Sequence, residues 1–158
     1  MKACEFAVLI HECFSEVLDA MYFTTVLDSG PQEMAAEDLP ETGAPVAFSL
    51  RFAGDVSGSF GLLLDESTAR KLAANFLGED ESSISSIEVG EVAGELANML
   101  CGSVMSRVEG EHKFVLSHPE AVALSPVLGT GDELVCRFAT DSGDVTVWIA
   151  LEGDLCRL

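Results

Sequence analysis

The sequence predicts a single α+β domain in which helices pack on one mainly antiparallel sheet. Apolar residues recur with either a helical or a two-residue period, and the segments follow in the order α-β-β-α-α-β-β-β. This order lacks the regular strand-helix alternation of a parallel, doubly wound fold. The length of 158 residues suits one domain covering residues 1–158, and 48% hydrophobic residues provide enough apolar surface for a folded core.

The N-terminal third predicts one helix and then a connecting loop. The helical period covers about residues 5–26, and its apolar positions include Phe6, Leu9, Ile10, Cys13 and Leu18. The opening apolar run is short, acidic residues follow it at helical spacing, and no cleavage site for a signal peptide appears. Residues 28–45 are rich in Gly, Pro and acidic residues, so we expect no regular element there.

The middle of the chain predicts a hairpin and two helices. Alternating apolar residues mark strands over 46–52 and 58–64, joined by a turn at Gly54-Asp55. A helix over 66–77 is expected to stop at Gly78. Ser85 and Glu88 have the spacing of a capping box, which predicts that the next helix begins there and continues to about residue 108, with Gly110 just beyond it.

The last part of the chain predicts three strands, over 113–124, 133–140 and 145–151. The turn residues Asp141-Ser142-Gly143-Asp144 connect the last two. Together with the hairpin, these strands complete the sheet of the α+β domain.

Composition excludes several classes of function. A formal charge of -19 repels phosphate backbones and anionic lipids, which argues against nucleic acid and membrane partners. The charge either favours a partner with a basic patch or simply keeps the protein soluble. No apolar stretch approaches the roughly 18–20 residues of a membrane span. Five cysteines, odd in number and without a C-x-x-C pair, fit reduced cytoplasmic thiols rather than disulfides or a zinc site.

A polar strip on the third predicted helix carries the functional signal. At about 100° per residue, Glu91, Glu95, Asn98 and Gly102 fall within an arc of about 60°. The apolar residues of the same helix lie on a different face, so the strip can face solvent. Glu91 and Glu95 are either ordinary solvated charges or part of a site. Asn98 favours the second interpretation, because asparagine is a poor helix former.

The segment Glu91-Val-Ala-Gly-Glu95-Leu-Ala-Asn98-Met-Leu-Cys-Gly102 resembles the signature helix of the CheC/CheX chemotaxis phosphatases, and Pro119 follows as in that family. The resemblance covers about residues 5–151 and implies a CheX/CheC-like domain. Glu91 departs from the pattern, because Asp or Ser is commoner there. CheC carries a second active helix, but Asp19 stands here in place of its asparagine. A carboxylate repels a phosphoryl group, so we expect one site per chain, as in CheX.

The resemblance implies a phosphatase that hydrolyses the aspartyl-phosphate of a CheY-type response-regulator receiver domain. In this interpretation Asn98 orients the attacking water and Glu95 pairs with the receiver's active-site lysine, while Glu91, Gly102 and Pro119 contact the partner. The receiver supplies Mg²⁺, so no cofactor of the chain's own is expected. CheX relatives form dimers, and exposed strand edges invite pairing, so we expect a homodimer.

Two alternatives remain open. One is a module of the same fold that binds a receiver or another signalling partner without hydrolysis. The other is metal-dependent hydrolysis at His112 and His118, although these residues form no H-E-x-x-H motif. No P-loop, dinucleotide fingerprint or G-x-S-x-G elbow is present.

Overall fold

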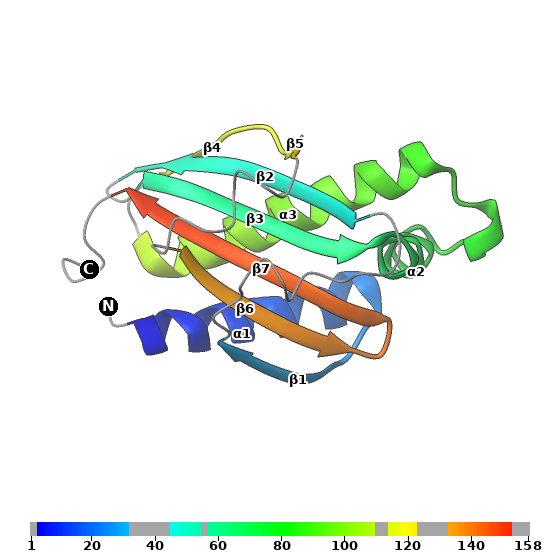
Figure 1. The fold of residues 1–158 in the computed structure, drawn as a ribbon, viewed down its shortest axis with the longest axis horizontal. Helices are drawn as coiled ribbons and strands as arrows, with labels where there is room; N and C mark the ends of the chain where they lie inside the picture. The colour runs from blue at the N-terminus through cyan, green and yellow to red at the C-terminus, as the bar shows by residue number, and fades with distance from the viewer. Residues whose placement is uncertain (1–2, 32–44, 55–56, 110–113, 123–132, 153–158) are drawn as a thin grey trace.

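A computed structural model describes residues 3–31, 45–54, 57–109, 114–122 and 133–152 of the chain (Figure 1). The helices are α1 (Ala3–Tyr22), α2 (Glu66–Leu77) and α3 (Ser86–Glu109), with a 3-10 turn, η2, at Glu81–Ser83. The strands are β1 (Val26–Pro31), β2 (Pro45–Ala53), β3 (Ser57–Asp65), β4 (Val115–Leu116), β5 (Glu120–Ala121), β6 (Glu133–Thr140) and β7 (Gly143–Glu152).

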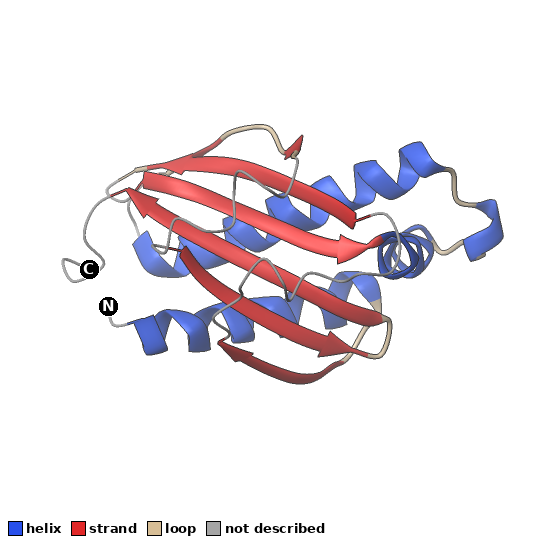
Figure 2. Cartoon of the chain, viewed as in Figure 1, coloured by secondary structure: helices blue, strands red, loops and turns tan. Residues whose placement is uncertain are grey.

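The strands form one seven-stranded sheet in the order β1-β6-β7-β3-β2-β4, and β5 also pairs with β2. Every pairing is antiparallel. Helices α1 and α3 run along one face of the sheet, and α2 lies at one end of the strands (Figures 1 and 2). The predicted α+β class with helices on an antiparallel sheet is confirmed.

The prediction of no regular element after the first helix was wrong over residues 28–31, because β1 forms there; residues 32–44 of the predicted loop lie outside the described residues. It pairs with β6 at the edge of the sheet, in a register that brings Pro31 opposite Cys136. Glycine and proline are tolerated in an edge strand, where one side of the backbone needs no partner. The pairing residues are more than a hundred positions apart, so local sequence did not reveal the strand.

Helix α1 ends at Tyr22, earlier than the predicted end near residue 26. Phe23 takes a left-handed backbone conformation with φ of 47°, which breaks the helix. The backbone N–H of Thr24 then donates to the Leu18 carbonyl at 3.1 Å, and its hydroxyl donates to the Tyr22 carbonyl at 2.9 Å. These bonds satisfy helix carbonyls that would otherwise lack a partner.

The strand predicted over 113–124 is instead two short strands on either side of Pro119. Both pair with β2. Between them, the Ser117 N–H donates to the Arg51 carbonyl at 2.8 Å, and the Ser117 hydroxyl accepts from the Arg51 N–H at 2.8 Å. A proline cannot donate to a strand ladder, which explains the interruption. Residues 110–113 and 123–124 lie outside the described residues.

The predicted end of α2 and the predicted start of α3 are confirmed. Gly78 ends α2 with φ of 67°, and the Asp65 carboxylate caps its start by accepting from the Thr68 N–H at 2.6 Å. In the capping box before α3, the Ser85 hydroxyl accepts from the Glu88 N–H at 3.1 Å. The Glu88 carboxylate accepts from the Ser85 N–H at 3.3 Å in return.

The main core lies between the helices and the sheet. Its fully buried members come from all three helices and four strands, and include Phe14, Leu18, Phe52, Phe60, Leu72, Leu96, Leu100, Phe138 and Val147. A smaller cluster of Ala47, Leu63, Val135 and Trp148 is separate from it. The main core anchors α3 from below and leaves its opposite side for other contacts.

Candidate functional site

Helix α3 presents the predicted polar strip on its outer side. The side chains of Glu91 and Glu95 are exposed and Asn98 is half-buried. The buried positions of the helix are Val89, Val92, Ala93, Leu96, Ala97, Leu100, Cys101, Val104 and Met105. Because these apolar residues fix the rotation of the helix on the sheet, the glutamates and the asparagine are held on one face without being buried.

Pro119, the one predicted site residue that is not on α3, lies beside this strip. Pro119 packs next to Gly94 of α3, where an added Cβ atom would lie 3.7 Å from Pro119 Cβ and 3.4 Å from the ring of Phe48. The β4–β5 connection therefore packs directly against the helix that carries Glu95. The proline is 24 positions beyond Glu95 in the sequence, and only tertiary packing brings the two together.

A shallow pocket of about 450 Å³ opens between α3 and the β4–β5 connection. Its lining residues include Glu91, Glu95, Phe48 and Pro119. Asn98 and Gly102 do not line it; they continue the strip along the helix toward β4, where a Cβ on Gly102 would lie 3.7 Å from Leu116. The five predicted residues thus share one surface but not one cavity.

The acidic residues of this surface have no ionic partner among the residues described. The ion pairs among the described residues are formed by Arg51, Arg70, Arg107 and Arg137, and none of these arginines pairs with Glu91 or Glu95. Two uncompensated carboxylates on one helix face attract a cationic group from a partner. The surface is therefore suited to a contact with a lysine or arginine of another molecule.

Tyr22, at the end of α1, is a neighbour of the site that the sequence did not reveal. Its side chain is fully buried and stacks on Phe76, with ring centroids 5.0 Å apart. Burial raises the pKa of Tyr22 well above its usual range, and the charge of Glu95 raises the pKa further. Because its pKa is raised, Tyr22 is a neutral phenol at neutral pH, close to the charge of Glu95. Its hydroxyl has no hydrogen-bond partner within the described residues.

Helix α1 carries a related pattern, with Glu12, Glu16 and Asp19 at the same spacing as Glu91, Glu95 and Asn98. Arg107 of α3 pairs with Glu16, and its other terminal nitrogen lies 3.9 Å from Glu12. Glu16, which corresponds to Glu95 in this spacing, thus already has an ion-pair partner within the chain.

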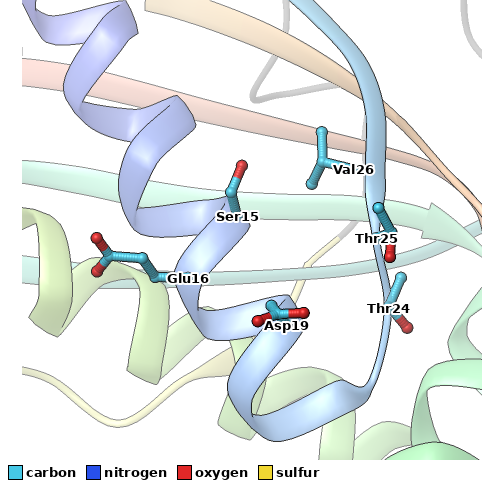
Figure 3. Close-up of a pocket in the computed structure, with 6 residues that line it drawn as sticks. All are labelled: Ser15, Glu16, Asp19, Thr24, Thr25 and Val26. Carbon is cyan, nitrogen blue, oxygen red and sulfur yellow. The ribbon is translucent and has the colours of Figure 1, made fainter.

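A second pocket of about 340 Å³ lies beside α1 (Figure 3). Ser15 and Asp19 project from the helix toward Thr24, Thr25 and Val26, whereas Glu16 points to another side of the helix (Figure 3). The described residues of the lining include side chains with hydroxyls and carboxylates but no amide side chain. Its chemistry therefore differs from that of the strip on α3, and a single site per chain stays a prediction.

Other chemistry finds little support in the described part of the chain. No group of three or more His, Cys, Asp or Glu side chains there could hold a metal ion. His118 is exposed at the edge of the α3 pocket, while His112 lies outside the described residues. Burial raises the pKa of Cys101 to about 12, so this thiol stays protonated and unreactive at neutral pH. None of the helices within the described ranges has the length and apolar character needed to cross a bilayer.

Comparison with known proteins decides the family. The family model described as "Chemotaxis phosphatase CheX" matches residues 46–138, more than half of the chain. This protein belongs to the CheX family. The matched segment contains α3 with its polar strip and the β4–β5 connection with Pro119, so the predicted family resemblance is confirmed.

Solved structures of CheX proteins share the fold. A chain of the CheX–CheY–BeF3–Mg²⁺ complex from Borrelia burgdorferi has a TM-score of 0.72 and 20% identity, covering 94% of this chain and 98% of its own. CheX from Vibrio vulnificus has a TM-score of 0.69 and 22% identity, covering 96% of this chain and 99% of its own. CheX from Desulfovibrio desulfuricans has a TM-score of 0.68 and 20% identity, covering 94% and 99%. No curated protein matches the sequence.

Membership of the CheX family supports a role as a chemotaxis phosphatase in general terms.

Proposed function

We propose that this protein hydrolyses the aspartyl-phosphate of a CheY-type receiver domain, with Glu95 and Asn98 as its catalytic residues. The observation that carries the proposal is the arrangement on α3, where an exposed carboxylate and a half-buried amide lie side by side and Pro119 packs next to them. Family membership and the CheX–CheY complex of Borrelia burgdorferi support the same class of substrate.

Asn98 would enter the phosphorylation site of the receiver and hydrogen-bond the attacking water. Glu95 and Asn98 are three residues apart, about 4.5 Å along the helix, so both can reach one small site on a partner. An amide cannot remove a proton from water, but phosphoryl transfer depends more on orientation and charge neutralisation than on a strong base. Asn98 therefore acts by holding the oxygen of the water in line with the bond that breaks.

Glu95 would pair with the active-site lysine of the receiver. Its carboxylate is exposed and has no ion-pair partner within the described residues, so it can form a charge-assisted contact without breaking another. Such a contact fixes the register of docking and brings Asn98 to the phosphoryl group. Glu91, Gly102 and Pro119 would complete the docking surface around these two residues.

The receiver would supply the phosphorylated aspartate and the Mg²⁺. The described residues of this chain contain no metal-binding cluster, and the Mg²⁺ of the Borrelia burgdorferi complex accompanies CheY and BeF3. We also propose a cytoplasmic location, which suits the free cysteines Cys13, Cys101 and Cys136. A homodimer remains part of the proposal, with the edge strand β1 as one place for pairing.

The test is the rate at which a phosphorylated CheY-type receiver from the same organism loses its phosphoryl group at saturating Mg²⁺. We expect the wild-type protein to accelerate the loss and Asn98→Ala to reduce the acceleration by about a hundredfold or more, because the water is no longer held in line. Binding of the BeF3-loaded receiver should survive this change. Asn75→Ala on α2 is a control that removes an amide elsewhere.

The competing function is that of a receiver-binding module without hydrolysis. If the wild-type protein binds the receiver but leaves the lifetime of its phosphoryl group unchanged, the phosphatase proposal fails for that receiver. If Asn98→Ala hydrolyses as fast as the wild type, the role assigned to Asn98 is wrong.

A further inference from the structure

We infer that the pocket between the N-terminal half of α3 and the β4–β5 connection is a second contact for the receiver, with Ile87 as its apolar anchor. The inference rests on the proposed function and extends it. Glu95 and Asn98 would determine where the chemistry happens, whereas Ile87 would determine how tightly and how selectively a receiver is bound.

Ile87 is unusually exposed for its residue type. It is the second residue of α3, its side chain is 75% exposed, and it lines the pocket. Exposing an isoleucine leaves apolar surface in water that burial would stabilise, so such a side chain within a pocket marks a contact surface. The half-buried ring of Phe48 provides a further apolar wall of the same pocket.

The glycines of α3 give this pocket its shape. A Cβ atom on Gly90 would lie 3.9 Å from Phe48 Cζ, and one on Gly94 would lie 3.4 Å from the same ring. Because neither position carries a side chain, the space above the Phe48 ring between Ile87 and Pro119 is left open. An apolar side chain of a partner can therefore reach the Phe48 ring.

The occupant is identified by continuity and charge. Glu91, Glu95 and Pro119 line this pocket and also belong to the proposed docking surface, so one partner meets both. Ile87 lies eight residues before Glu95, about 12 Å along the helix. A stable interface buries about 800 Å² on each side, a patch about 30 Å across, so a receiver centred on Glu95 covers the pocket as well.

Among the described residues, no lysine or arginine lines the pocket, whereas Glu91 and Glu95 do. Its chemistry fits an apolar side chain bordered by positive charge, and the active-site lysine with which Glu95 is proposed to pair would supply that charge. It does not fit an acidic partner.

The experiment compares Ile87→Asp with Val8→Asp. Val8 on α1 is also exposed, at 58%, and lies outside the pocket, so the control makes the same chemical change elsewhere. An aspartate in the first turn of α3 is compatible with the helix dipole, so the variant is expected to fold. Three quantities are measured with a CheY-type receiver: the Kd for its BeF3–Mg²⁺ form, and the kcat and KM of dephosphorylation.

We expect Ile87→Asp to raise Kd and KM by about tenfold or more and to leave kcat little changed, because loss of an apolar anchor weakens docking and not chemistry. Val8→Asp should leave all three constants unchanged. Equal Kd values for both variants and the wild type would overturn the inference while leaving hydrolysis intact. Weakened binding by Ile87→Asp to a receiver that the wild type does not dephosphorylate would support the inference and refute the proposed function instead. Sedimentation of each protein alone adds a further outcome: if Ile87→Asp dissociates a dimer, a second copy covers the pocket and the inference is wrong.

Discussion

The packing of Trp148 on Gly61 predicts that Gly61→Ala destabilises the fold strongly. A Cβ atom at Gly61 would lie 1.8 Å from Cε2 and Cζ2 of the indole, whereas carbon atoms in contact need about 3.5–4.0 Å. The ring would have to move by about 2 Å, yet it is fully buried against Leu63 and Val135. We therefore expect a loss at the upper end of the range for overpacked cores, about 3 kcal/mol, or about 6–12 °C in Tm for a domain of this size.

The assay uses the same side chain, because Trp148 is the only tryptophan in the chain. Urea unfolding followed by tryptophan fluorescence measures the free energy of unfolding, and the emission of the folded state reports whether the indole has moved. Gly90→Ala is the matched control. Gly90 lies inside α3, and an added Cβ atom would make an ordinary 3.9 Å contact with Phe48. Because alanine is a better helix former than glycine, this variant should stabilise the folded protein by up to about 1 kcal/mol. If Gly61→Ala unfolds at the same urea concentration as the wild type with unchanged emission, the packing argument is refuted.

Three further predictions concern the helix cap, the docking surface and a buried thiol. Ser85→Ala removes the acceptor for the Glu88 N–H and should cost about 1 kcal/mol in urea unfolding; an unchanged midpoint would contradict the capping role. Gly102→Ala should stabilise α3 by up to about 1 kcal/mol and yet lower kcat/KM toward a phosphorylated receiver, if the partner backbone passes close to Gly102; unchanged kcat/KM would exclude that approach. Burial raises the pKa of Cys101 from 9.0 to about 12, so the unfolded chain releases this proton first as pH rises. The contribution of Cys101 to stability should be fully present below pH 9 and be lost as pH rises from 9 toward 12, which unfolding titrations at several pH values would detect.

Prediction from sequence was most successful for elements whose signals are local. The capping box of Ser85 and Glu88 located the start of α3 within one residue, and the left-handed glycine at Gly78 located the end of α2. The polar strip on α3 also followed from sequence, since helix geometry alone places Glu91, Glu95 and Asn98 on one face. These features depend on residues within about one to three turns of one another.

Elements that depend on distant partners were missed or misjudged. Strand β1 exists because its backbone meets β6, and its own sequence has the composition of a loop. The strand around Pro119 splits in two because both halves pair with β2 while the proline cannot. In both cases the decisive hydrogen bonds join segments that are far apart in the chain.

The sequence by itself determined the fold class and the helix that carries the candidate site, and it predicted which side chains of that helix form the site. Only the tertiary structure decided what surrounds it: Pro119 and Phe48 beside Gly94, the buried hydroxyl of Tyr22 near Glu95, and Arg107 occupying Glu16 on α1. The physical reason is that side-chain periodicity is a property of one element, whereas a pocket is formed where several elements meet. The pairing of β2 with β4 and β5 holds Pro119 beside α3 and so creates the surface on which a receiver is proposed to bind.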